Sequence, residues 1–96
     1  MEQLIYTIEG SGTRSLWKQL QNVPIIKHCD EDINPADYTK IYTTNRNPEL
    51  VRQTWLNRGL DFKKWEKAWQ NWAKIKPYAT VYEMNDLDYW EGANAH

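Results

Sequence analysis

The sequence predicts one small α+β domain whose strands and helices follow the order β-α-β-β-(αα)-β. Three observations predict it. A chain of 96 residues, 41% of them hydrophobic, can build one core but is too short for two. Short runs of β-forming residues alternate with segments of helical periodicity, and glycine or proline marks most boundaries. Because this order resembles the ferredoxin-like one, we expect a small ferredoxin-like sheet packed on one side by helices.

The first half of the chain contains three of the expected strands. Residues 4–9 alternate in the manner of a strand, and the turn "GSGT" leads to a helix that Thr13 can cap. Pro24 ends this helix, since proline cannot continue it. Residues 24–29 and 39–44 then predict strands on either side of a polar loop.

The second half predicts two helices and a last strand. Asn47 and Pro48 are typical of a helix start, and this helix ends near Arg58, before Gly59. Asp61 can cap a second helix over 62–76, and residues 78–84 predict a fourth strand. We therefore expect a compact domain over 1–85, followed by an acidic, aromatic and partly flexible tail over 86–96.

The charge is unevenly distributed although the net charge is only −1. Residues 28–38 and 79–96 are acidic, whereas residues 39–78 are basic. The sequence has one cysteine, no signal-peptide pattern and no apolar run of membrane-spanning length, so we expect a soluble cytoplasmic protein with no membrane partner.

The stretch "GSGTRS" over 10–15 resembles a phosphate-binding turn in its glycine content. It lacks the lysine and the first glycine of a P-loop, and Ser15 stands where a dinucleotide-binding turn needs its third glycine. We also expect no room in 96 residues for the dinucleotide-binding fold. What the stretch predicts is a turn with a generic anion site at Gly12, Thr13 and Arg14.

The predicted helix over 62–76 is strongly amphipathic. Trp65, Trp69 and Trp72 share one side of a helical wheel, and lysines line the opposite side. An aromatic stripe at this spacing usually packs on the core, although six tryptophans are more than a small core easily hides. The lysines could instead contact phosphates of a nucleic acid.

Catalytic or metal chemistry has little support in the sequence, so we expect no enzyme, cofactor or metal. His28 and Cys29 are adjacent on a strand and point to opposite faces, and one cysteine with two histidines is too few for a zinc site. A cleft that brought Glu9, His28 or Cys29 together with Arg14 would favour an enzyme.

The function predicted from the sequence is a module that binds a macromolecule, most simply a protein. Its profile is shared with viral or mobile-element inhibitors of a host nucleic-acid enzyme or immune complex. The alternative is a nucleic-acid or nucleotide binder that uses the basic helix pair and the turn over 10–15; the oligomeric state is not predicted. The expected partner-binding residues belong to the helix pair and the tail: Arg52, Trp55, Arg58, Lys63, Lys67, Lys74, Asp86, Asp88, Tyr89 and Trp90.

Overall fold

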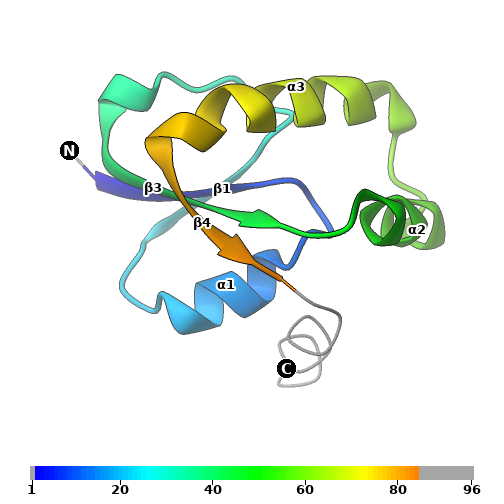
Figure 1. Ribbon diagram of the computed structural model, residues 1–96, viewed down its shortest axis with the longest axis horizontal. Coiled ribbons are helices and arrows are strands. Elements are labelled where there is room, and N and C mark those ends of the chain that lie inside the picture. The colour runs from blue at the N-terminus through cyan, green and yellow to red at the C-terminus, as the bar shows by residue number, and fades with distance from the viewer. Residues whose placement is uncertain (1, 85–96) are drawn as a thin grey trace.

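The computed structural model describes residues 2–84, which form a four-stranded sheet with helices around it (Figure 1). The strands are β1 (Glu2–Thr7), β2 (Ile25–His28), β3 (Tyr38–Asn45) and β4 (Ala79–Glu83). The α-helices are α1 (Thr13–Gln19), α2 (Pro48–Arg58) and α3 (Trp65–Ile75), and short 3-10 helices are η1 (Pro35–Asp37), η2 (Phe62–Lys64) and η3 (Lys76–Tyr78). The predicted α+β class and element order are confirmed.

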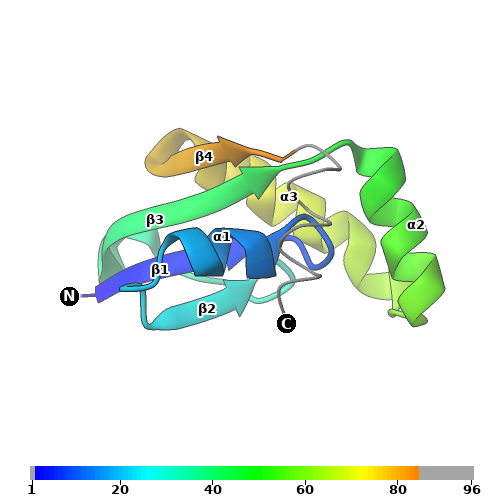
Figure 2. The same ribbon diagram turned by 90° about the horizontal axis from the view of Figure 1, so that it is seen from below.

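All strand pairs in the sheet are parallel, and the strand order is β2-β1-β3-β4. The predicted ferredoxin-like sheet, which is antiparallel, is therefore wrong. The difference arises in the connection over 29–37, which returns to the amino end of the sheet and places β3 on the far side of β1 from β2. All four strands consequently end at the same edge, with α2 beyond it (Figure 2).

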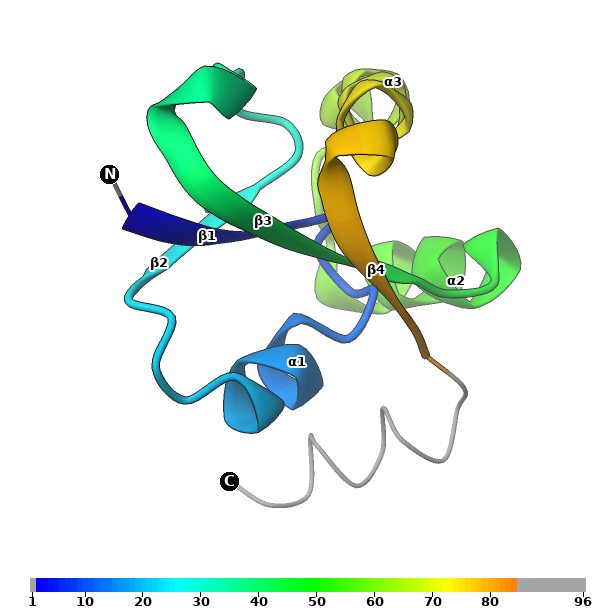
Figure 3. The same ribbon diagram turned by 60° about the vertical axis from the view of Figure 1, so that its left-hand side comes forward.

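Helices cover both faces of the sheet, so the predicted one-sided packing is also wrong. α3 lies over one face and α1 over the other (Figures 1 and 3). Leu4 and Ile8 belong to the cluster under α3, whereas Ile5 packs with Leu16 of α1.

β1 is one of the two inner strands and is buried on both faces. Residues 4–8 are each at most 1% exposed, the continuous burial expected of a strand inside a parallel sheet. Because β1 lies between β2 and β3, its carboxyl end lies in the inner part of the sheet edge.

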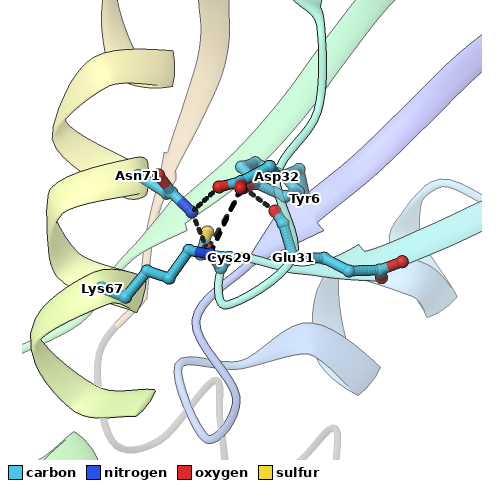
Figure 4. A network of polar contacts seen from close by, with 6 residues as sticks. All are labelled: Tyr6, Cys29, Glu31, Asp32, Lys67 and Asn71. Carbon is cyan, nitrogen blue, oxygen red and sulfur yellow. Dashed lines mark hydrogen bonds and ion pairs between the residues drawn. The ribbon is translucent and has the colours of Figure 1, made fainter.

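Side chains hold the connection over 29–37 against the face that α3 covers (Figure 4). The Tyr6 hydroxyl donates to the carbonyl oxygens of Cys29, at 3.2 Å, and Glu31. Asn71 of α3 donates to the Cys29 carbonyl at 2.7 Å and to the Asp32 carboxylate at 3.1 Å. Burial raises the pKa of Tyr6, which keeps this donor protonated. In a helical connection, backbone carbonyls accept hydrogen bonds from backbone amides of the same helix. In this loop, side chains supply the donors for the Cys29 and Glu31 carbonyls.

The predicted limits of α2 and of the second helical segment are confirmed. Asn47 Oδ1 accepts a hydrogen bond from the Glu49 amide at 3.0 Å, and Gly59 has a left-handed φ of 65°. Asp61 accepts from the Lys63 amide at 2.9 Å and begins η2, which continues into α3.

The start of α1 differs from the prediction. Gly12, with φ 100°, is the cap residue, and no side chain caps the helix. The Thr13 hydroxyl instead shares a 2.7 Å hydrogen bond with Thr7 Oγ1. Thr13 therefore ties the helix start to the end of β1.

The tryptophan-rich face of α3 packs towards the sheet. Ala68 and Ile75 are buried at its centre, and the three tryptophans are partly buried beside them. The predicted tail over 86–96 lies outside the described residues.

Candidate functional site

A pocket of about 240 Å³ lies at the carboxyl edge of the sheet. It is formed where the turn after β1, the first turn of α1, the end of β2 and the end of α2 meet. The side chains and backbone that line it come from Glu9, Gly10, Gly12, Thr13, Arg14, Ser15, His28 and Arg58. Segments more than forty residues apart thus share one surface.

The turn after β1, which lines the pocket, also lies beside the point where the chain connections of the sheet diverge. From β1 the chain passes through α1 on one face to β2, and from β3 it passes through α2 and α3 to β4 at the opposite side of the sheet. The connections therefore diverge between β1 and β3. In open parallel sheets, ligands bind outside the carboxyl ends of the strands at this kind of switch point.

The turn after β1 requires both of its glycines for its own conformation. Gly10 has φ 84° and Gly12 has φ 100°. A Cβ would lie 2.9 Å from Thr54 Cγ2 at the first position and 2.9 Å from Met84 Cγ at the second. The glycine spacing is therefore explained by close packing on α2 and on Met84, with no need for a ligand.

Buried hydroxyl groups fix the same turn from beneath. Ser11 Oγ shares a 2.6 Å hydrogen bond with Thr44 Oγ1 of β3, and the Ser11 amide donates to the Ile8 carbonyl at 3.0 Å. Together with the Thr7–Thr13 bond, these contacts join the turn to both central strands. The turn that borders the pocket is therefore held by hydrogen bonds within the protein itself.

Two arginines give the pocket its positive charge. Arg14 extends from α1 and Arg58 from the last turn of α2, and both are exposed. Guanidinium groups bind phosphate or carboxylate through paired N–H donors. Glu9 and His28, both half-buried, add a carboxylate and an imidazole to the same lining. The arrangement can therefore bind an anionic group and offers titratable groups beside it.

Cys29 does not belong to this chemistry. Its side chain is fully buried, and burial, with a contribution from Asp30, raises the pKa of the thiol. The structure therefore brings Glu9, His28 and Arg14 into one cleft but leaves Cys29 in the core.

The structure places the whole predicted anion site in the pocket, together with one residue of the predicted partner surface. Gly12, Thr13 and Arg14 line the pocket, and so does Arg58, which the sequence predicts on the partner surface. The prediction of Trp55 as a contact residue is wrong, because its side chain is 3% exposed and packs in the core.

Four other predicted contact residues do not line the pocket. Arg52 and Lys63 are exposed, and Lys74 lines a separate cavity beside Tyr6 and Asn71. Lys67 pairs with Asp32 at 3.2 Å, which joins the basic helix to the acidic loop. The remaining four, Asp86, Asp88, Tyr89 and Trp90, lie outside the described residues.

Sequence reasoning missed Arg46, which directly follows β3. Its side chain is 6% exposed and donates through Nη1 to the Gly10 carbonyl at 2.8 Å. An arginine placed just after a buried run, at the end of a parallel strand, was the available signal. That signal required knowing that the strands are parallel.

No protein-family model matches this sequence, and no curated protein or solved structure matches it significantly. Within residues 2–84, no three His, Cys, Asp or Glu side chains are grouped so as to hold a metal ion. Over the same residues, no helix is both long and apolar enough to cross a membrane. Function is therefore inferred from the geometry of the pocket.

Proposed function

We propose that this protein binds the phosphate moiety of a small phosphorylated molecule, such as a nucleotide, in the pocket at the carboxyl edge of the sheet. The observation that carries the proposal is that Arg14 and Arg58 line one pocket with the turn after β1, at the carboxyl edge of a parallel sheet. Because the two arginines come from different helices, their shared pocket depends on the whole fold.

The size of the pocket favours a compact anionic group. A volume of about 240 Å³ is below the roughly 300–1,000 Å³ of sites that enclose a whole ligand. The pocket therefore suits one or two phosphate groups, with the rest of the ligand outside. Among the described lining residues, Arg14 and Arg58 bring two guanidinium groups and Glu9 brings one carboxylate, which favours an anionic ligand.

The nucleic-acid alternative along α3 receives less support. Lys67 and Lys64 pair with Asp32 and Asp30 of the loop, at 3.2 Å and 3.5 Å. A polyanion on this surface would meet those carboxylates as well as the lysines. Binding of a protein partner stays a prediction, but Trp55 no longer contributes to it.

Titration with inorganic pyrophosphate and with ATP at low ionic strength tests the proposal. Arg58→Gln is compared with Arg52→Gln, because both arginines are exposed on α2 and only Arg58 lines the pocket. Loss of a charge-assisted contact of about 1.5–3 kcal/mol predicts an affinity about ten- to a hundredfold lower for Arg58→Gln and unchanged for Arg52→Gln. Equal effects of the two substitutions, or no binding by the wild type, would overturn the proposal.

A second candidate is hydrolysis of the bound phosphoanhydride, which the presence of Glu9 and His28 in the same pocket favours. A water oxygen would attack the terminal phosphorus, the bond to the bridging oxygen would break, and Glu9 would accept the proton of the water. Phosphate release from ATP should then be abolished in Glu9→Gln while nucleotide binding is kept. If the wild type binds ATP but releases no phosphate, the hydrolysis candidate is wrong and the binding function is kept.

A further inference from the structure

Two side chains outside the pocket lining also hold the turn that borders the pocket. They donate hydrogen bonds to the backbone carbonyls of two consecutive turn residues, Glu9 and Gly10. Trp55 Nε1 of α2 donates to the Glu9 carbonyl at 2.6 Å. Arg46 Nη1 donates to the next carbonyl, that of Gly10, at 2.8 Å, and reaches Thr54 Oγ1 at 3.3 Å. Consecutive carbonyls of the turn are therefore fixed by donors from α2 and from the end of β3.

Both donors are buried. The Trp55 indole is 3% exposed and makes an edge contact with Trp65 at a centroid distance of 5.0 Å. It also packs against Phe62 at 5.7 Å, and the Arg46 side chain is 6% exposed. Neither residue lines the pocket, so neither would touch the ligand.

α2 links this support to the pocket lining. Arg58 lies one helical turn after Thr54 and Trp55 on the same helix, and it is the residue of α2 that enters the pocket. The close approach of Gly10 to Thr54 presses the turn directly onto that helix. The distance between the turn and the Arg58 guanidinium is therefore set by how α2 is anchored to the turn.

We infer that Trp55 and Arg46 are positioning residues for anion binding: they fix the turn over 10–14 relative to Arg58, so that both sides of the pocket reach one phosphate group. This inference rests on the proposed function. Binding groups must be held close to their productive geometry, and a donor that fixes a loop acts on affinity without touching the ligand.

Trp72 supplies a matched control on another helix. Its Nε1 donates to the Thr44 carbonyl at 2.8 Å, which is the same kind of indole-to-carbonyl bond, but it joins α3 to β3. Phenylalanine at either position removes one indole donor and keeps an aromatic ring. If the Trp55 hydrogen bond only stabilises the fold, Trp55→Phe and Trp72→Phe should have the same effect on pyrophosphate affinity.

The test measures pyrophosphate affinity for the wild type, Trp55→Phe and Trp72→Phe, each at a temperature where it is folded by circular dichroism. We expect Trp55→Phe to bind about three- to tenfold more weakly, the range for loss of one neutral hydrogen bond, and Trp72→Phe to bind like the wild type. Equal affinities of all three would overturn the positioning role and leave the proposed function standing. Absence of binding by the wild type would overturn both.

A second measurement needs no variant. In the wild type titrated with pyrophosphate, the indole ¹H–¹⁵N signal of Trp55 should shift in proportion to the bound fraction, because its acceptor is the carbonyl of a pocket residue. The indole signal of Trp72 should stay in place. A bound state that moves both signals equally, or neither, contradicts the positioning role.

Discussion

Gly12 and Met84 meet at the carboxyl edge of the sheet, where a Cβ on Gly12 would lie only 2.9 Å from Met84 Cγ. The contact joins the turn after β1 to the residue that follows β4, across the width of the α1 face. The glycine that seemed to belong to a ligand-binding pattern is therefore also a packing requirement.

Substitution of this glycine should be costly because backbone and packing both oppose it. Gly12→Ala should destabilise the fold by about 2–4 kcal/mol, the sum of a left-handed backbone penalty and an overpacked contact. Gly59→Ala should cost only about 1–2 kcal/mol, since Gly59 has φ 65° but nothing within 4 Å of its added Cβ. Urea denaturation gives both values, and equal losses would contradict the Met84 contact.

Asn71 should stabilise the connection over 29–37 more than its neighbours on α3 do. Asn71→Ala removes the 2.7 Å bond to the Cys29 carbonyl, which still has Tyr6 as a donor, so we expect a loss of about 1–1.5 kcal/mol. Gln70→Ala, the adjacent exposed position, should cost less than about 0.5 kcal/mol. Thermal or urea unfolding of the two variants measures the difference; similar losses would show that the connection is held by other contacts.

The pKa of Asp32 should report the contact between this connection and α3. The hydrogen bond from Lys67, then that from Asn71, lowers the pKa of the Asp32 carboxyl. Stability from this lowered pKa is present above the ordinary aspartate pKa and is lost as pH falls through the lowered value. In a carboxyl ¹³C titration, Lys67→Ala should move the Asp32 midpoint upwards, towards the ordinary value. An unmoved midpoint would mean that the ion pair does not form in solution.

Cys29 should be inert in the folded protein. Burial raises the pKa of its thiol, so little thiolate is present at pH 8 and the sulfur is inaccessible. A thiol reagent should react at the rate of local or global opening in native conditions and rapidly in denaturant. Immediate stoichiometric reaction of the native protein would place Cys29 at the surface.

The limits of α2 and of the segment formed by η2 and α3 could be predicted from the sequence because their causes are local, whereas α1 has no side-chain cap and ends at Gln19, well before Pro24. Asn47, Pro48, Gly59 and Asp61 act within one or two residues of a helix end, and each has the predicted role. The lysine and tryptophan faces of α3 likewise follow from periodicity alone.

The sheet could not be predicted in the same way, because strand pairing is decided by contacts distant in the sequence. The connection over 29–37 contains no α-helix, so it favoured an antiparallel pair, whereas Tyr6 and Asn71 allow it to cross the sheet as a loop. One signal was present: residues 4–8 form a nearly unbroken apolar run, typical of a strand buried on both faces.

In the candidate site too, features with local causes could be predicted, and features that depend on strand pairing could not. Arg14 and the turn were identified from the sequence, but the meeting of Arg14, His28 and Arg58 depends on the parallel sheet. Trp55 illustrates the opposite error, since an aromatic residue on an amphipathic helix can serve either a surface or a core.

Amide chemical-shift mapping of the ¹⁵N-labelled protein during a pyrophosphate titration at low salt tests the central claim most directly. The account predicts saturable shifts confined to the turn over 9–15, His28 and the end of α2 around Arg58, with residues 34–41 at the opposite edge unmoved. Shifts centred on the lysine face of α3, or no saturable shifts at all, would contradict it.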